Sequence, residues 1–194
     1  MNNKIKILLI PFIIIFGTIT AQEEQSVEKL KSYQKLEVGY MFGGQAYNDN
    51  FSYNPGFQGH GVFGFHISKR FNVGFGIGYY QLTKERFLPI FAEVNGYTKG
   101  NDKISNLITM QLGYAPGWYN EQIGYSDYHY SGGIIFDAGF GLQIKINNTV
   151  SAYFKLSYRH QFAHISYELF RGTTHSESLN YDLLNIAFGI KYSK

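Results

Sequence analysis

One stretch of this chain constrains its fold more than any other: residues 132–146, where apolar side chains occupy every second position. Successive side chains of a β-strand point to opposite faces, so the stretch predicts a strand with one apolar face. The other face carries small, polar or charged residues, among them Asp137, Gln143 and Lys145. The apolar positions are Ile134, Phe136, Ala138, Phe140, Leu142, Ile144 and Ile146. This division indicates a transmembrane β-strand with lipid on one side and a filled lumen on the other.

The same alternation recurs along the chain and predicts an all-β fold, an eight-stranded antiparallel up-and-down transmembrane β-barrel. Pro89 falls near the start of one expected strand, a position where proline is tolerated. The expected strands are 35–44, 57–68, 71–82, 88–97, 104–114, 132–146, 150–162 and 181–192.

The connections between these strands alternate in length, as expected for a barrel with short turns on one side of the membrane and longer loops on the other. An even number of strands then places both chain ends on the side of the short turns, the periplasm. The expected turns are 68–70, 98–102 and 147–149, and the expected external loops are 45–56, 83–87, 115–131 and 163–180.

The first residues predict export. Lys4 and Lys6 precede an apolar run over 7–19, and small residues Thr20 and Ala21 follow it. A charged start, a short apolar middle and a small-residue exit are typical of a secretory signal peptide. We therefore expect cleavage of 1–21 on the Sec pathway, a short periplasmic lead-in at 22–34, and one outer-membrane barrel domain at 35–194.

The composition agrees with this location. Without the signal peptide the chain has fifteen basic and fourteen acidic residues, a charge near +1 that gives no reason to expect nucleic-acid binding. There are no cysteines, which excludes disulfides and thiolate chemistry. The 17 Tyr, 17 Phe and 22 Gly residues suit membrane interfaces and a crowded lumen. The six histidines show no ligand spacing, so we expect neither a metal nor a cofactor.

The inward-facing positions of the expected strands collect polar and charged side chains. An eight-stranded barrel is just wide enough for side chains to fill it, so we expect these groups to pair across the lumen rather than to line an open channel. The turn 147–149 also sets a register that places Asp137 opposite Arg159. The expected lumen residues are Lys35, Glu37, His66, Glu93, Gln111, Asp137, Gln143, Lys145, Lys155, Arg159, Asn185 and Lys191.

Two segments carry a resemblance to a known group, 71–80 (FNVGFGIGYY) and 186–192 (IAFGIKY). With the overall pattern they resemble the small eight-stranded outer-membrane barrels of the OmpX and OmpA-transmembrane type, especially those of Bacteroidota. The resemblance implies insertion by the barrel-assembly machinery, which reads a closing aromatic residue, here Tyr192 followed by Ser193 and Lys194. It also implies contact with outer-membrane lipid and lipopolysaccharide.

A His-x-Ser sequence, His164-Ile165-Ser166, stands at the external end of the seventh strand. A serine next to a histidine that a carboxylate orients can act as a nucleophile for acyl transfer. The position and spacing resemble lipid A deacylases of the PagL type, which implies Glu168 or Glu177 as the carboxylate. Those enzymes have asparagine after the serine, where this chain has Tyr167. The interpretation we favour is two polar residues at the point where a strand leaves the membrane.

The expected loop at 115–131 is rich in aromatic side chains, which can recognise sugars or proteins, or can form part of an interface belt. These candidates are Trp118, Tyr119, Tyr125, Tyr128 and Tyr130. The sequence thus favours a non-enzymatic outer-membrane barrel that serves envelope structure or surface adhesion, with an extracellular glycan or protein as partner. A lipid A deacylase, a serine ester hydrolase at the outer leaflet, is the alternative.

Overall fold

The computed structural model describes residues 31–47, 50–98, 103–119, 128–169 and 173–194, and these residues form one antiparallel sheet. No helix in these ranges is long and apolar enough to cross a membrane. Three short strands lie outside the main ring: β2 (Asn50–Tyr53), β5 (Glu85–Phe87) and β8 (Gly117–Tyr119). The ring strands are β1 (Ser32–Tyr47), β3 (Gly56–His66), β4 (Phe71–Gln81), β6 (Ile90–Tyr97), β7 (Ile104–Ala115), β9 (His129–Lys145), β10 (Val150–Leu169) and β11 (Thr173–Ser193).

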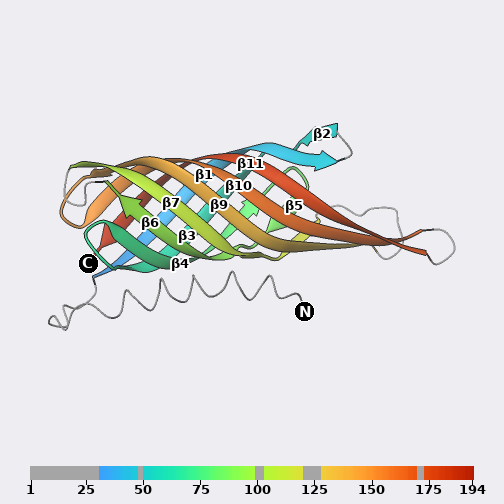
Figure 1. The fold of residues 1–194 in the computed structure, drawn as a ribbon, viewed down its shortest axis with the longest axis horizontal. Helices are drawn as coiled ribbons and strands as arrows, with labels where there is room; N and C mark the ends of the chain where they lie inside the picture. Colours follow the sequence, from blue (N-terminus) through green and yellow to red (C-terminus); the bar gives the residue numbers. More distant parts are fainter. Residues whose placement is uncertain (1–30, 48–49, 99–102, 120–127, 170–172) are drawn as a thin grey trace, which may run out of the picture.

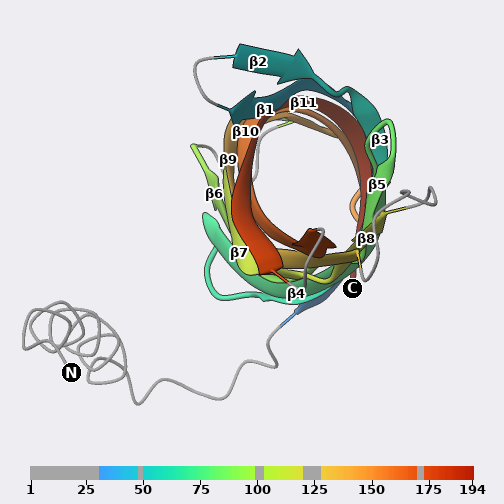
Figure 2. The ribbon, with the colours of Figure 1, turned by 90° about the vertical axis from the view of Figure 1, so that its right-hand side faces the viewer.

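The eight ring strands close into a barrel because β1 pairs with β3 on one side and with β11 on the other (Figure 2). Each of the remaining strands pairs with its neighbours in chain order. Following the paired residues once round the ring from Tyr192 leads to Asp182 on the same strand, an offset of ten residues. A closed ring needs such a stagger, and it tilts the strands relative to the barrel axis.

The barrel has two unlike ends. The terminal end holds both Ser32 and Lys194, whose backbones are bonded at 3.0 Å, together with the three short turns. In one of these turns the Asn147 side-chain oxygen accepts from the backbone N–H of Thr149 and of Val150, at 2.9 and 2.7 Å. At the opposite loop end, β10 and β11 extend beyond the ring (Figure 1). We call this extension, residues 163–169 and 173–180, the outer hairpin.

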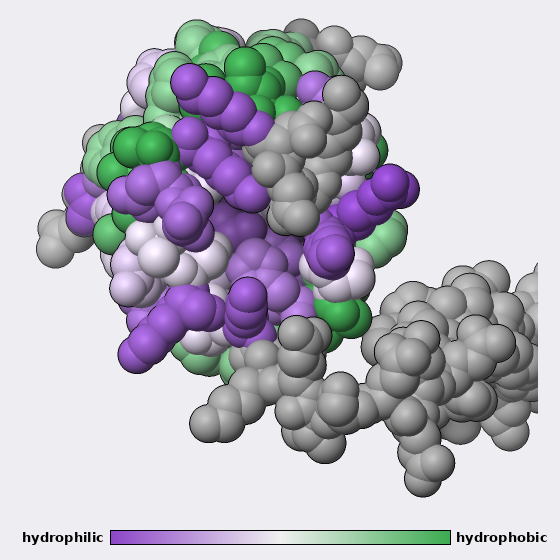
Figure 3. All heavy atoms as spheres, turned by 90° about the vertical axis from the view of Figure 1, so that its left-hand side faces the viewer, coloured by the Kyte–Doolittle hydropathy of each residue, from purple (hydrophilic) through white to green (hydrophobic). Residues whose placement is uncertain are grey.

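The outside of the ring is apolar, the reverse of a soluble protein. Leu36 and Phe75, for example, expose 71% and 75% of their surface, and they follow the predicted outward phase. Apolar side chains also surround the polar face of the terminal end (Figure 3). A surface of this kind is stable only against lipid.

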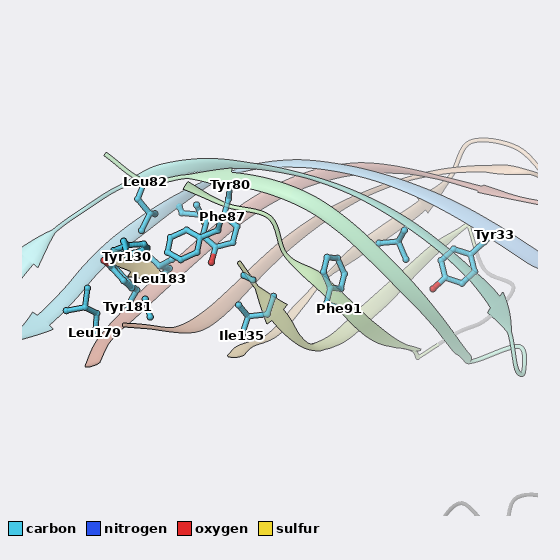
Figure 4. Close-up of a cluster of buried hydrophobic side chains, with 14 residues drawn as sticks. Tyr33, Tyr80, Leu82, Phe87, Phe91, Tyr130, Ile135, Leu179, Tyr181 and Leu183 are labelled. Carbon is cyan, nitrogen blue, oxygen red and sulfur yellow. Dashed lines mark hydrogen bonds between the residues drawn. The ribbon is translucent and has the colours of Figure 1, made fainter. Parts of the chain in front are cut away.

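Bulky side chains fill the interior, and glycines on the neighbouring, hydrogen-bonded strand make room for them. A side chain at Gly76 would overlap the ring of Phe91, and one at Gly78 would overlap the ring of His60. The glycines at 74, 76 and 78 therefore lie on the lumen side of β4, which agrees with the expectation that glycine suits a crowded lumen. Apolar side chains concentrate toward the loop end, while Phe91 and Tyr33 lie further along the barrel (Figure 4).

The predicted strands correspond to the eight ring strands, with errors confined mainly to the loop end. The expected loop 163–180 is wrong, because all of its described residues continue β10 and β11. The expected loops 45–56, 83–87 and 115–131 contain β2, β5 and β8. At Gly43, where φ is +141°, only glycine is unstrained. Beyond it, β1 pairs with β2 on the edge that pairs with β3 as far as Met41, and it stays paired with β11 as far as Gln45.

Candidate functional site: a filled lumen and an outer hairpin

A first ion pair closes the terminal half of the lumen. The Lys35 ammonium lies 2.7 Å from both carboxylate oxygens of Glu93, across the barrel from β1 to β6. The Glu93 carboxylate also accepts from the amides of Asn95 and Gln111, at 2.6 and 2.8 Å. Both charges are buried, so the hydrogen bonds offset the cost of removing them from water.

A second group of charges occupies the middle of the lumen. Lys155 contacts Glu37 at 2.7 Å and lies 3.9 Å from Asp137. The Arg159 guanidinium lies 3.2 Å from Asp137. Asp137 and Arg159 pair in register, as the 147–149 turn predicted. The same carboxylate oxygen accepts from Ser157 and from Asn185.

Three of the expected basic lumen residues have no carboxylate partner among the described residues. The Lys191 ammonium lies between the rings of Tyr33 and Tyr97, 5.0 and 4.7 Å from their centres, and donates to the Tyr97 hydroxyl at 3.3 Å. His66 bonds Ser193 at 3.2 Å, and Lys145 stands half-buried at the terminal end. Stacking on aromatic faces thus replaces the expected ion pair for Lys191.

Sequence reasoning missed two lumen residues of the second strand, Gln58 and His60. Both are almost fully buried, and His60 lies 3.7 Å from Glu37. They share the inward phase of His66, so the alternation alone could have identified them.

An aromatic cluster closes the loop end of the lumen. Phe87, fully buried on β5, stacks on Tyr80 with ring centres 4.7 Å apart and meets Tyr130 and Tyr181 edge-on. The neighbouring Glu85 accepts from the Tyr181 hydroxyl at 3.2 Å and from the amide of Asn54 at 2.8 Å. The short strand β5 is therefore fixed across the mouth of the barrel.

The expected aromatic surface residues separate into different environments. Trp118 is exposed beside Tyr79, whereas Tyr130 is buried and belongs to the cluster that closes the lumen, which corrects its assignment to the surface. Tyr119 and Tyr128 contact each other, with ring centres 5.8 Å apart. Tyr125 lies outside the described residues.

The possible catalytic residues do not form the expected triad. The His164 imidazole bonds Ser176, at 2.9 Å, and Ser166 lies across from Ser176 in the β10–β11 register. Glu177 contacts His175 at 3.6 Å, on the opposite face of the outer hairpin from His164. Glu168 is exposed, and no carboxylate among the described residues contacts His164.

One edge of the outer hairpin has no partner strand among the described residues. β11 pairs with β10 along its whole length, but its pairing with β1 stops at Tyr181. Residues 173–180, which we call the β11 edge, therefore present one side of their backbone outward. Beside it, on one face of the hairpin, the Tyr167 ring lies between Tyr128 and His175, at 6.3 and 5.1 Å.

No family model and no curated protein matches the sequence. Solved structures do share its fold. Neisserial surface protein A superposes with a TM-score of 0.59 at 12% identity, covering 83% of this chain and 96% of that protein. The outer membrane protein OprG of Pseudomonas aeruginosa gives 0.57 at 9% identity, covering 85% and 97%. This chain has the fold of a small outer-membrane β-barrel. At such low identity the likeness concerns the fold alone.

Proposed function

We propose that the chain spans the bacterial outer membrane, with the terminal end in the periplasm and the outer hairpin outside the cell. The apolar outer surface and the closed ring support this arrangement, because a closed barrel satisfies every backbone hydrogen bond within the bilayer. The proposal includes export on the Sec pathway, directed by signal peptide 1–21, and insertion into the membrane by the barrel-assembly machinery. Outer-membrane phospholipid and lipopolysaccharide would then surround the barrel.

Its function, in this proposal, is to contact a partner at the cell surface rather than to move solutes. The ion pairs of Glu93 and Asp137 and the rings around Phe87 fill the lumen along its length, which argues against transport. The proposal requires no cofactor.

The β11 edge is the observation that carries the binding function. An unpaired strand edge offers backbone N–H and C=O groups that can pair with an added strand, and natural proteins usually protect such edges. Its sequence, TTHSESLN, has only one large apolar residue, Leu179, which is buried. The edge is therefore hydrophilic enough to remain in water until a partner arrives.

The partner that fits this edge is an extended segment of an extracellular protein. In β-strand addition the backbone supplies affinity, and alternate side chains supply specificity. An added strand would place every second residue beside His175 and Glu177, next to the Tyr167 and Tyr128 rings. An extracellular glycan could use the same rings but not the backbone groups.

The test is selection of short random peptides, displayed on phage, against the folded full chain in detergent micelles. We expect peptides with alternating side-chain character whose binding is lost in Ser176→Pro and in a variant with 163–179 replaced by Asn-Gly. Ser176→Ala, the matched control, should bind normally, because it keeps the backbone donor. Failure to enrich any peptide, or equal binding to the shortened variant, would refute binding at the edge.

A lipid A deacylase is the second candidate, and one observation favours it: the 2.9 Å bond from Ser176 to His164. A serine within hydrogen-bond reach of a histidine is the starting arrangement of a nucleophile. The described residues supply no carboxylate to orient His164, so we favour surface binding. Mass spectrometry of lipid A from cells with the gene, without it, or with Ser176→Ala distinguishes the two. An acyl chain lost only with the unaltered gene would establish the deacylase.

A further inference from the structure

Positive charge gathers at the terminal end of the barrel. Basic side chains stand in the turn between β3 and β4, directly before β7, at the last residue of β9 and at both ends of the described chain. Figure 3 shows hydrophilic residues at this end. We call this set the basic rim. Its members are Lys31, Lys69, Arg70, Lys103, Lys145 and Lys194.

The basic rim has no acidic counterpart among the described residues. The three carboxylates nearest to it along the strands, Glu37, Glu93 and Asp137, are buried in the lumen, where each is paired with a cation. The remaining described acidic residues, Glu85, Glu168, Glu177 and Asp182, belong to the loop end. Among the described residues, therefore, no acidic side chain stands at the rim beside these cations.

The rim cations stand where the apolar outer surface stops. Lys69 and Arg70 lie between exposed Ile67 and Phe71. Lys103 directly precedes exposed Ile104, and its carbonyl accepts from the backbone N–H of Lys145 at 2.8 Å. Cations at several points around the ring, at the level where the apolar surface stops, are placed to meet lipid headgroups rather than one side of a single macromolecule, although Lys145 shares the inward phase of the lumen residues.

We propose that the basic rim binds the phosphates of anionic phospholipids in the leaflet around the terminal end. The inference rests on the proposed membrane-spanning arrangement but is independent of peptide binding at the β11 edge. Phosphate is the anion that such headgroups present, and both lysine and arginine bind it. The rim would thereby fix the depth and orientation of the barrel from the periplasmic side.

The experiment measures which lipids contact the barrel. The full chain is folded into phosphatidylcholine vesicles, and spin-labelled phosphatidylglycerol or phosphatidylcholine is added in trace amounts. Electron spin resonance then gives the fraction of each lipid held at the protein surface. One cation near an anionic surface changes affinity about fivefold. Because only one leaflet meets the rim, we expect phosphatidylglycerol to be favoured about twofold or more overall.

Two variants assign this preference to the rim. The preference for phosphatidylglycerol should be abolished when four rim residues are changed together: Lys69→Gln, Arg70→Gln, Lys103→Gln and Lys145→Gln. It should be weakened by salt at about 0.5 M, because salt screens interactions between exposed charges. The matched control exchanges Lys and Arg at these four positions and should keep it.

Several results would overturn the proposal. One is equal association of the two lipids, and another is a preference that survives in the glutamine variant. Rim-dependent pelleting with purified peptidoglycan, without lipid preference, would assign the rim to a cell-wall polymer instead. If no lipid were held at the protein surface, the barrel would not be in the bilayer, and the membrane-spanning arrangement would fail as well.

Discussion

Asp137 and Arg159 show what a charge requires inside this lumen. Neither side chain is exposed, and besides Asp137 the guanidinium contacts the Tyr80 ring and the Met41 sulfur. Asp137→Asn keeps an amide oxygen for Ser157 and Asn185 but leaves Arg159 without its carboxylate. We expect a loss of about 3–5 kcal/mol in the free energy of unfolding, measured by urea titration in detergent micelles.

The control is the double change Asp137→Asn with Arg159→Met, which removes both charges. It should be more stable than Asp137→Asn alone, because no unpaired charge remains buried. A double variant that is less stable than the single one would mean that the pair is not the stabilising unit.

A substitution at Gly76 tests the packing between the neighbouring strands β4 and β6. Gly76→Ala adds a methyl group against the Phe91 ring and should cost about 1–3 kcal/mol through overpacking. Gly61→Ala is the control, because its nearest neighbours would be 3.9 Å or more away. In the Phe91→Ala background the cost of Gly76→Ala should largely vanish, as a double-mutant cycle would show. Strictly additive losses would contradict this contact.

At the scale of the strands, the outer hairpin contributes little pairing to the ring, because only its residues 163–166 pair with β9. In the part of the chain that the structure describes, β1 pairs with β11 only from Tyr181 onward, and beyond Ser166 β10 pairs only with β11. Replacing 163–179 by Asn-Gly should therefore leave the barrel closed, with its unheated electrophoretic mobility still faster than its heated one. Loss of this difference would show that the hairpin supports the ring.

The sequence predicted a strand correctly where the two faces of that strand have different environments. Ring strands alternate because lipid and lumen impose opposite chemistry on their two faces, so their phase and the Asp137–Arg159 register were predictable. In the outer hairpin only Ala163, Ile165 and Leu179, near its base, belong to the buried cluster or pack against it, which is too short an apolar pattern to mark residues 163–180 as strand. The three residues of β5 are too few for a periodic signal, although Phe87 closes the lumen.

For the alternative of a lipid A deacylase, closeness in the sequence identified the wrong serine as the partner of His164. His164 and Ser166 share a face of β10, but the serine bonded to His164 comes from β11. Which residues pair across the two strands depends on the register of the outer hairpin. Because the sequence predicted a loop for residues 163–180, it gave no register for them.

The whole molecule is a barrel without an open channel. The lumen is occupied from Lys191 near the terminal end to Phe87 near the loop end, and an eight-stranded ring has room only for such side chains. Purified protein in planar lipid bilayers should therefore give no stable conductance steps. Large, reproducible steps would contradict the filled lumen.

The central claim, a closed barrel that spans the outer membrane, is tested most directly by gel mobility of the tagged chain in separated cell fractions. The chain should be recovered with the outer membrane and should migrate faster before heating than after it. The reason is that a ring with complete inter-strand hydrogen bonding resists detergent until it is heated. Recovery in the soluble periplasmic fraction, with one mobility before and after heating, would contradict the account.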